Sequence, residues 1–127
     1  MTKNPKIMNK ILVLILLSLG LFFNSCNNTK VYKEYSINDL NKPLNDTLKS
    51  DNVDNKVVGV EIIIVGQING EALLEFENGA GRYSKINLKN KVNQTYETEW
   101  YSPKIFFRYN PISEIKGDSL KLKYRMY

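Results

Sequence analysis

The segment that most constrains the fold is "VVGVEIIIVGQINGEALLEFE", residues 57–77. It contains two runs rich in Val, Ile, Leu and Phe, with Asn69-Gly70 between them. Branched and aromatic residues favour strands, and Asn-Gly favours a two-residue type I′ turn because both central residues need positive φ. The segment therefore predicts a β-hairpin in which Ile68 pairs with Glu71.

That register sorts the side chains of the hairpin onto two faces, since successive residues of a strand point to opposite sides. One face would hold Ile63, Val65, Ala72, Leu74 and Phe76, with Gln67 among them. The other would hold Ile62, Ile64, Ile68, Leu73, Glu71, Glu75 and Glu77. The second face carries the acids and is predicted to be the more solvent-exposed of the two.

The rest of the chain continues with short alternating runs. "KIFFRY" puts Ile105, Phe107 and Tyr109 on one side, and "SLKLKYRMY" alternates apolar with basic residues. Polar or Gly-containing stretches such as "ENGAGRYSK" and "KNKVNQ" read as turns between strands. Short strands broken by regular turns predict a mostly β protein, a small antiparallel β-sandwich or barrel.

The segment before this β region is polar and predicts a different structure. Ile37, Leu40, Leu44 and Leu48 have helical spacing, but Pro43 argues against a continuous helix. We expect a tether, followed by a short helix or a loose edge segment at residues 44–49. The predicted organisation is therefore a leader at 1–25, a tether with a short helix at 26–52 and an antiparallel β domain at 53–127.

The leader has the layout of a secretory signal peptide. Lys3, Lys6 and Lys10 precede an apolar run over residues 11–23, and no acid lies among them. A helix over that run would rise only about 20 Å, short of the roughly 30 Å hydrocarbon core of a bilayer. A permanent transmembrane span is therefore disfavoured.

The residues at the end of the leader narrow the cleavage chemistry. "FNSC", Phe23 to Cys26, resembles the lipobox of bacterial lipoproteins, in which a bulky apolar residue and two small ones precede the cysteine. Phe23, Ser25 and Cys26 match that pattern, and Asn24 departs from it. The resemblance covers residues 1–26 only and implies a cell-envelope protein held in the membrane by lipid on Cys26. Asn27 after the cysteine further implies sorting to the outer membrane.

Cys26 is the only cysteine, and the chain contains no His. A polar stretch follows Cys26, which argues against a buried thiol, and a reactive thiol would lack a His base. Loss of Lys3, Lys6 and Lys10 with the leader reduces 18 basic residues to 15 against 13 acidic ones, for a net charge of +2. That value removes most of the support for nucleic-acid binding.

The residue inventory also argues against an enzyme. Without His, the Ser-His-Asp, Cys-His and zinc-hydrolase schemes have no participants, and we expect no cofactor and no metal. Glu97 and Glu99 could share a strand face as an acid–base pair, although a solvated face explains them better. Asp51 and Asp54 lack EF-hand spacing, so a polar turn is the better account.

Aromatic and basic residues lie close together in the second half of the chain, as they do in binding hot spots. The candidate binding surface comprises Arg82, Tyr83, Trp100, Tyr101, Lys104 and Arg108. Phe106 belongs to the same aromatic group, and the competing interpretation is that these rings fill the core. We therefore expect a non-enzymatic module for binding or structure, with an envelope protein or glycan as its partner.

Two alternatives remain open. "NGAGRYSK", Asn78 to Lys85, is similar to the Gly-rich loop of small lipoprotein inhibitors of C-type lysozyme, which implies a β-barrel that blocks a secreted hydrolase. The disulfide of that family is absent here. A carbohydrate-binding module would instead present Trp100 or Tyr101 flat in a groove.

Overall fold

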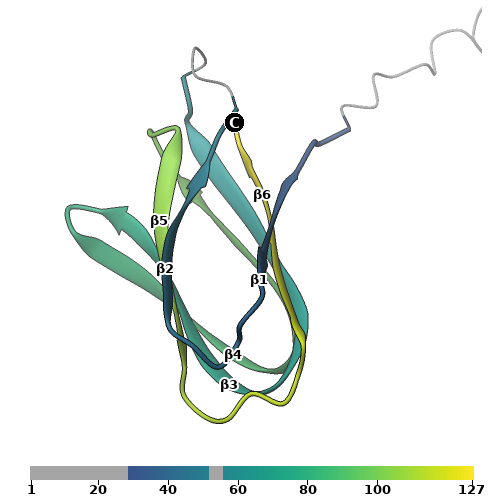
Figure 1. The fold of residues 1–127 in the computed structure, drawn as a ribbon. Helices are drawn as coiled ribbons and strands as arrows, with labels where there is room; N and C mark the ends of the chain where they lie inside the picture. Colours follow the sequence, from purple (N-terminus) through teal and green to yellow (C-terminus); the bar gives the residue numbers. More distant parts are fainter. Residues whose placement is uncertain (1–28, 52–55) are drawn as a thin grey trace, which may run out of the picture.

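The computed structural model describes residues 29–51 and 56–127 (Figure 1). The predicted leader, Cys26 and Asp54 lie outside these residues. The described chain forms six strands, β1 (Lys33–Ile37), β2 (Leu44–Lys49), β3 (Gly59–Gly79), β4 (Arg82–Glu99), β5 (Lys104–Pro111) and β6 (Ser119–Met126). No helix occurs within this part of the chain.

The long strand β3 organises the sheet. One edge of β3 pairs with β4 along nearly its whole length. The other edge pairs first with β6, over residues 60–67, and then with β5, over residues 72–76. β1 adds to β6 and β2 adds to β5, so the six antiparallel strands curl into one nearly closed barrel (Figure 1). The predicted small antiparallel β fold is confirmed, in its barrel form.

The hairpin predicted at Asn69-Gly70 is wrong. Asn69 does adopt positive φ, at 48°, but the chain does not reverse there. Instead, β3 bulges between Gln67 and Glu71 and bends, opposite Asn90 of β4, whose φ is 52°. The predicted polar turn "KNKVNQ" is likewise part of β4.

The loop between β5 and β6 explains why β3 bends at this corner. Its Ile112 N–H donates to the Glu71 carbonyl at 2.8 Å, and its Gly117 N–H donates to the Ile68 carbonyl at 2.7 Å. A Cβ on Gly70 would lie 2.6 Å from the Glu114 carbonyl oxygen, so glycine is needed for this close approach. These long-range contacts satisfy the backbone groups that the predicted hairpin would have paired locally.

The type I′ geometry occurs eleven residues later, at Ala80-Gly81. Both residues have positive φ, 52° and 72°, and Gly79 pairs with Arg82 on either side of them. This turn joins β3 to β4, and the hairpin end projects from the side of the barrel (Figure 1).

The bulge also changes which residues of β3 face inward. The buried apolar side chains of β3 are Val60, Ile62, Ile64, Ile68, Ala72, Leu74 and Phe76. Of the residues predicted to lie on the less solvent-exposed face, Ala72, Leu74 and Phe76 are buried. Ile63 and Val65 are not, because the bulge adds residues to β3 and so shifts the alternation between its two runs. Phe76 stacks on Tyr96 of β4 at 5.1 Å between ring centres, which packs the two halves of the bent β3–β4 ribbon together.

The alternation predicted for the last two strands is confirmed. In β5, Ile105, Phe107 and Tyr109 are buried while Lys104, Phe106 and Arg108 are exposed. In β6, Leu120, Leu122 and Tyr124 are buried.

The prediction of a tether and a short helix over residues 26–52 is wrong for Lys33–Lys49. This segment forms β1 and β2, which are the two ends of the strand order, so the β domain begins before residue 53. Ile37, Leu40 and Leu48 do face the core, but a strand, a turn and a second strand produce their helix-like spacing. The alternative of an edge segment at 44–49 matches β2.

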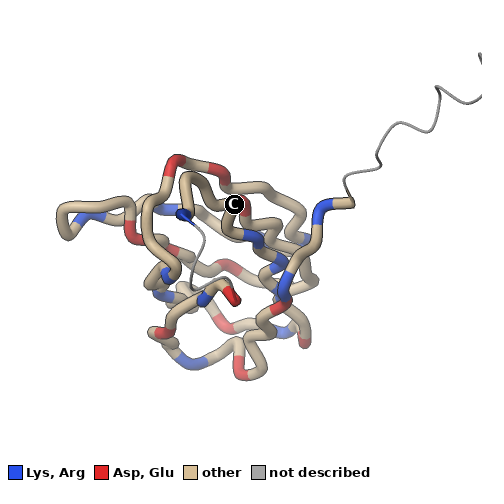
Figure 2. Tube along the Cα trace, turned by 90° about the horizontal axis from the view of Figure 1, so that it is seen from above, with Lys and Arg blue, Asp and Glu red and all other residues tan. Residues whose placement is uncertain are grey.

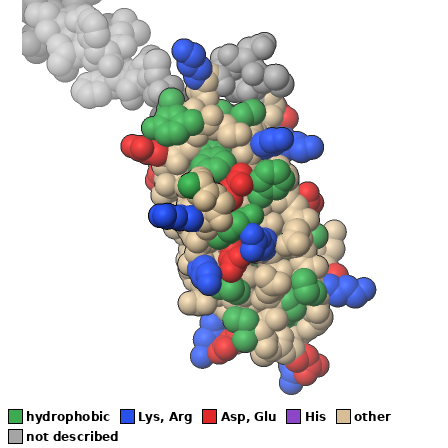
Figure 3. All heavy atoms as spheres, turned by 90° about the vertical axis from the view of Figure 1, so that its left-hand side faces the viewer, with side chains coloured by type: hydrophobic (Ala, Val, Ile, Leu, Met, Phe, Trp, Pro, Cys, Tyr) green, Lys and Arg blue, Asp and Glu red, His purple; other side chains and the backbone are tan. Residues whose placement is uncertain are grey.

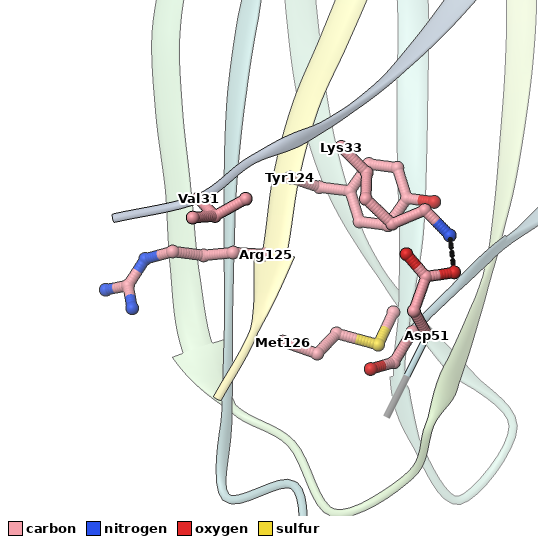
Figure 4. A pocket seen from close by; sticks show the side chains of 7 residues that line it. Val31, Lys33, Asp51, Tyr124, Arg125 and Met126 are labelled. Carbon is pink, nitrogen blue, oxygen red and sulfur yellow. Dashed lines mark hydrogen bonds and ion pairs between the residues drawn. The ribbon is translucent and has the colours of Figure 1, made fainter. Parts of the chain in front are cut away.

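Side chains bridge the seam where β1 meets β2. The Lys33 ammonium donates to Asp51 at 2.7 Å and to the Lys49 carbonyl at 3.1 Å, and the Tyr35 hydroxyl donates to Asp46. Figure 4 shows Lys33 and Asp51 on one side of a hollow of about 260 Å³ that Tyr124 also lines. The barrel is therefore closed here by side-chain hydrogen bonds.

Candidate functional site

The outer face of the barrel carries a cluster built around Arg108. The guanidinium carbon of Arg108 lies 3.6 Å from the centre of the Tyr83 ring. One guanidinium nitrogen also lies 3.7 Å from the carboxylate of Glu75, a residue of β3 that is only 8% exposed. The ring and the buried carboxylate together hold the cation in place.

Phe106 extends this cluster along β5. The β3–β5 ladder ends at the pair Phe76 and Phe107, and beyond it the Glu77 carboxylate accepts the Phe106 N–H at 3.2 Å. The Phe106 side chain remains 45% exposed, and the Lys104 ammonium lies 5.9 Å from its ring centre. A large aromatic surface therefore stays open to a ligand next to a fixed cation.

A groove of about 380 Å³ runs over this cluster. Its walls are Asn45, Asp46, Thr47, Tyr83, Phe106, Phe107 and Arg108. Figure 3 shows this side of the barrel, where hydrophobic side chains lie among basic and acidic ones. The sequence predicts a short helix or a loose edge segment at residues 44–49 and gives no sign that they reach this groove, because only the pairing of β2 with β5 brings them here.

The structure places the six predicted surface residues in different settings. Tyr83 and Arg108 contact each other at the groove, and Lys104 lies beside Phe106 at its end. Trp100 packs against the core, and its indole N–H donates to the Lys104 carbonyl at 3.0 Å.

The remaining two predicted residues do not line the groove. Arg82 is exposed at the projecting hairpin turn. Tyr101 is 74% exposed in the turn after β4. The predicted set is therefore only partly brought together.

The two strand carboxylates considered for acid–base chemistry are each engaged by a tyrosine. Glu97 accepts the Tyr127 hydroxyl at 2.7 Å, and Glu99 accepts the Tyr101 hydroxyl at 3.2 Å. These hydrogen bonds raise the pKa of both phenols. Across residues 29–51 and 56–127, no group of three or more acidic, His or Cys side chains is arranged to hold a metal ion.

A second polar cluster surrounds Glu61 on β3, which is 6% exposed. Its carboxylate accepts the Tyr32 hydroxyl and lies 3.3 Å from Arg125 and 3.5 Å from Lys30. The Tyr32 hydrogen bond lowers the pKa of Glu61, with Arg125 adding to the effect and burial opposing it. In the sequence, the signal for this cluster is that Glu61 is a single acid within an apolar strand, because a buried carboxylate needs a charged or hydrogen-bonding partner.

Charges of both signs are distributed around the barrel, as Figure 2 shows along the chain trace. Acids from the first half of the chain pair with basic residues from the second half. These pairs are Glu34 with Lys121, Glu71 with Lys89, Glu75 with Arg108 and Glu61 with Arg125. Residues 27–79 carry nine acidic and five basic side chains and residues 80–127 carry four and ten, so these pairs bring acids of the first part against basic residues of the second.

The groove offers the Arg108 cation, the rings of Tyr83 and Phe106, the Asp46 carboxylate and the amide and hydroxyl groups of Asn45 and Thr47. Such a surface can bind a ligand that combines an apolar or planar part with an acceptor group. The described part of the chain has no helix that is long and apolar enough to cross a membrane. No protein-family model matches the chain, and a search of the curated proteins finds no match to it.

Proposed function

We propose that this chain is a cell-envelope lipoprotein, anchored by lipid on Cys26, whose barrel is a non-enzymatic binding module. The support for the anchor is the basic and apolar leader followed by "FNSC". The support for binding over catalysis is the lack of His in the sequence together with the groove at Arg108. Asn27 after the cysteine favours the outer membrane.

The observation that carries the binding function is the contact between Arg108 and Tyr83 beside the exposed ring of Phe106. Arg and aromatic residues contribute most to binding energy when they are fixed before the partner arrives, because less rotamer freedom is then lost. Glu75 and Tyr83 fix Arg108 in this way.

The projecting hairpin favours a protein as the partner that binds at the groove. The Ala80-Gly81 turn projects beside the groove and presents Arg82 at its end, which is the convex loop expected of an inhibitor or immunity protein. The glycan alternative has less support, because Trp100 packs on the core with its N–H bonded internally.

The test is affinity capture from the cell envelope with the soluble chain starting at Asn27. We expect the partner to be retained by the unaltered chain and by Lys116→Ala, an exposed change at the far end of the barrel, and lost with Arg108→Ala and Phe106→Ala. Equal retention by all four proteins would overturn the proposed site. Recovery of one secreted hydrolase would identify inhibition as the activity.

Anchoring is tested separately with Cys26→Ala. We expect this change to abolish labelling by a palmitate analogue and to prevent cleavage to the mature size. A labelled, membrane-bound protein of mature size would show that the lipobox interpretation is wrong.

A further inference from the structure

We propose that the end of the barrel from which residue 29 extends rests on the surface of the lipid bilayer. We call this region the anchor-side end and define it by Val31, Val58, Tyr101 and Tyr127. The inference rests on the lipid anchor at Cys26 proposed above. It adds a second membrane contact and an orientation for the barrel.

The anchor-side end gathers most of the exposed large hydrophobic side chains of the described chain. Val31 is 82% exposed, Tyr101 74%, Val58 53% and Tyr127 42%. The N–H of Val58 donates to the Tyr127 carbonyl at 2.7 Å, and the Trp100 N–H donates to the Val58 carbonyl at 3.2 Å. Val31 shares the hollow of Figure 4 with Arg125 and Met126 at the end of β6, so the four residues belong to one end.

The position of the proposed anchor in the sequence indicates that the anchor-side end contacts the bilayer. Only three peptide units separate Cys26 from Thr29, and a fully extended chain of that length spans about 10 Å. A lipid on Cys26 would therefore hold the anchor-side end against the headgroup region. At that distance even a weak contact is populated, because tethering raises the effective concentration of the two surfaces.

The chemistry of the anchor-side end suits the bilayer interface. Tyrosine is enriched where apolar and aqueous regions meet, because its ring is apolar and its hydroxyl is polar. The hydroxyls of Tyr101 and Tyr127 donate to Glu99 and Glu97, so each of these two carboxylates has one hydrogen bond that does not come from water.

Exposed lysines lie close in the sequence to the apolar side chains of this end. Lys30 and Lys56 lie on the segments next to Val31 and Val58, and Lys104 begins β5 just after Tyr101. Ammonium groups at this depth can contact lipid phosphates while their alkyl stems pack on apolar surface. In this orientation the groove at Arg108 and the projecting hairpin face sideways, where a partner can reach them.

The test uses the full-length protein with a single added thiol, since the only native cysteine would be blocked by lipid. Val58→Cys and the matched control Ile112→Cys carry a small environment-sensitive fluorophore. Ile112 is 62% exposed and lies in the loop at the opposite end of the barrel, so both labels avoid the core. The proteins are reconstituted into phosphatidylcholine–phosphatidylglycerol vesicles with and without brominated lipid.

We expect brominated lipid to reduce the fluorescence of the Val58→Cys label by about twofold or more and to leave the Ile112→Cys label unchanged, since quenching requires contact with the acyl region. Adding Val31→Ser and Tyr101→Ser to Val58→Cys should restore most of the fluorescence. Equal quenching at both positions, or none at Val58→Cys in protein that floats with the vesicles, would overturn the inference. Labelling of the unaltered protein by the thiol reagent would instead overturn the anchor, and the inference with it.

Discussion

Arg108 and Tyr83, which are 25 positions apart in the sequence, contact each other on the outer face of the barrel, with the guanidinium carbon 3.6 Å from the ring centre. Two pairings produce this contact: β3 with β4 and β3 with β5. The contact fixes a cation at the edge of an aromatic groove, and the proposed binding function depends on it.

The energy of this contact can be isolated by a double-mutant cycle. Tyr83→Phe keeps the ring face and should change the free energy of unfolding by less than about 0.5 kcal/mol. Tyr83→Leu and Arg108→Gln should each destabilise the barrel and should couple by about 1 kcal/mol in urea unfolding. A coupling energy near zero would mean that the two side chains do not hold each other.

The turn at the projecting hairpin contains a correctable local strain. Ala80 has φ of 52°, a region that costs an Ala side chain about 1 kcal/mol and that Asn adopts more readily. Ala80→Asn should therefore raise the free energy of unfolding by roughly 0.5–1 kcal/mol. Ala80→Val should lower it, since a branched side chain is worse still at this φ. If thermal unfolding ranked Val above Asn, the assignment of the type I′ turn would be wrong.

The corner of β3 depends on the glycine of the β5–β6 loop. A Cβ on Gly117 would overlap the backbone carbonyl of Gln67, which cannot move away as a flexible side chain could. Gly117→Ala should therefore destabilise the barrel by about 3 kcal/mol. Lys116→Ala, an exposed change at the neighbouring position, should have an effect within about 0.5 kcal/mol in the same denaturant series. Similar values for both changes would contradict the close packing of the loop on β3.

The seam predicts a loss of stability at alkaline pH. Burial, followed by the hydrogen bond to Asp46, raises the pKa of Tyr35 from 10.0 to about 12. Because the folded-state pKa is the higher one, the stabilisation is fully present below pH 10 and is lost as the pH rises towards 12.

The free energy of unfolding should therefore fall over this range, and Tyr35→Phe should make the fall less steep. Other tyrosines with raised pKa values, including Tyr109, keep part of the slope in that variant. An unchanged slope in Tyr35→Phe would contradict the role of this hydroxyl at the seam.

Local patterns in the sequence predict the buried side chains of β5 and β6 correctly. The alternation of β5 and β6 identifies their buried side chains, since burial on one face of a regular strand has a period of two. Asn69 even adopts the positive φ expected of Asn-Gly. The hairpin fails because hydrogen bonds from the loop at residues 112–118 replace the local pairing, and these contacts leave no mark in the local sequence.

The sequence indicates some residues of the groove but not how they are arranged. It points to Arg108 and Tyr83 as residues suited to binding. It does not point to Asn45 and Thr47, because β2 pairs with a strand about 60 positions away. The ring of Trp100 suggests a binding residue, but it is partly buried against the core and its N–H donates to the Lys104 carbonyl.

Photocrosslinking in the cells that produce the protein tests the proposed groove most directly. A photoreactive phenylalanine analogue replaces Phe106, which lies in the groove, or Ile112, which is exposed at the far end of the barrel. We predict a discrete protein adduct at position 106, absent at position 112 and lost when Arg108→Ala is combined with the probe. No adduct at position 106, or the same adduct at both positions, would contradict the assignment of this groove as the binding site.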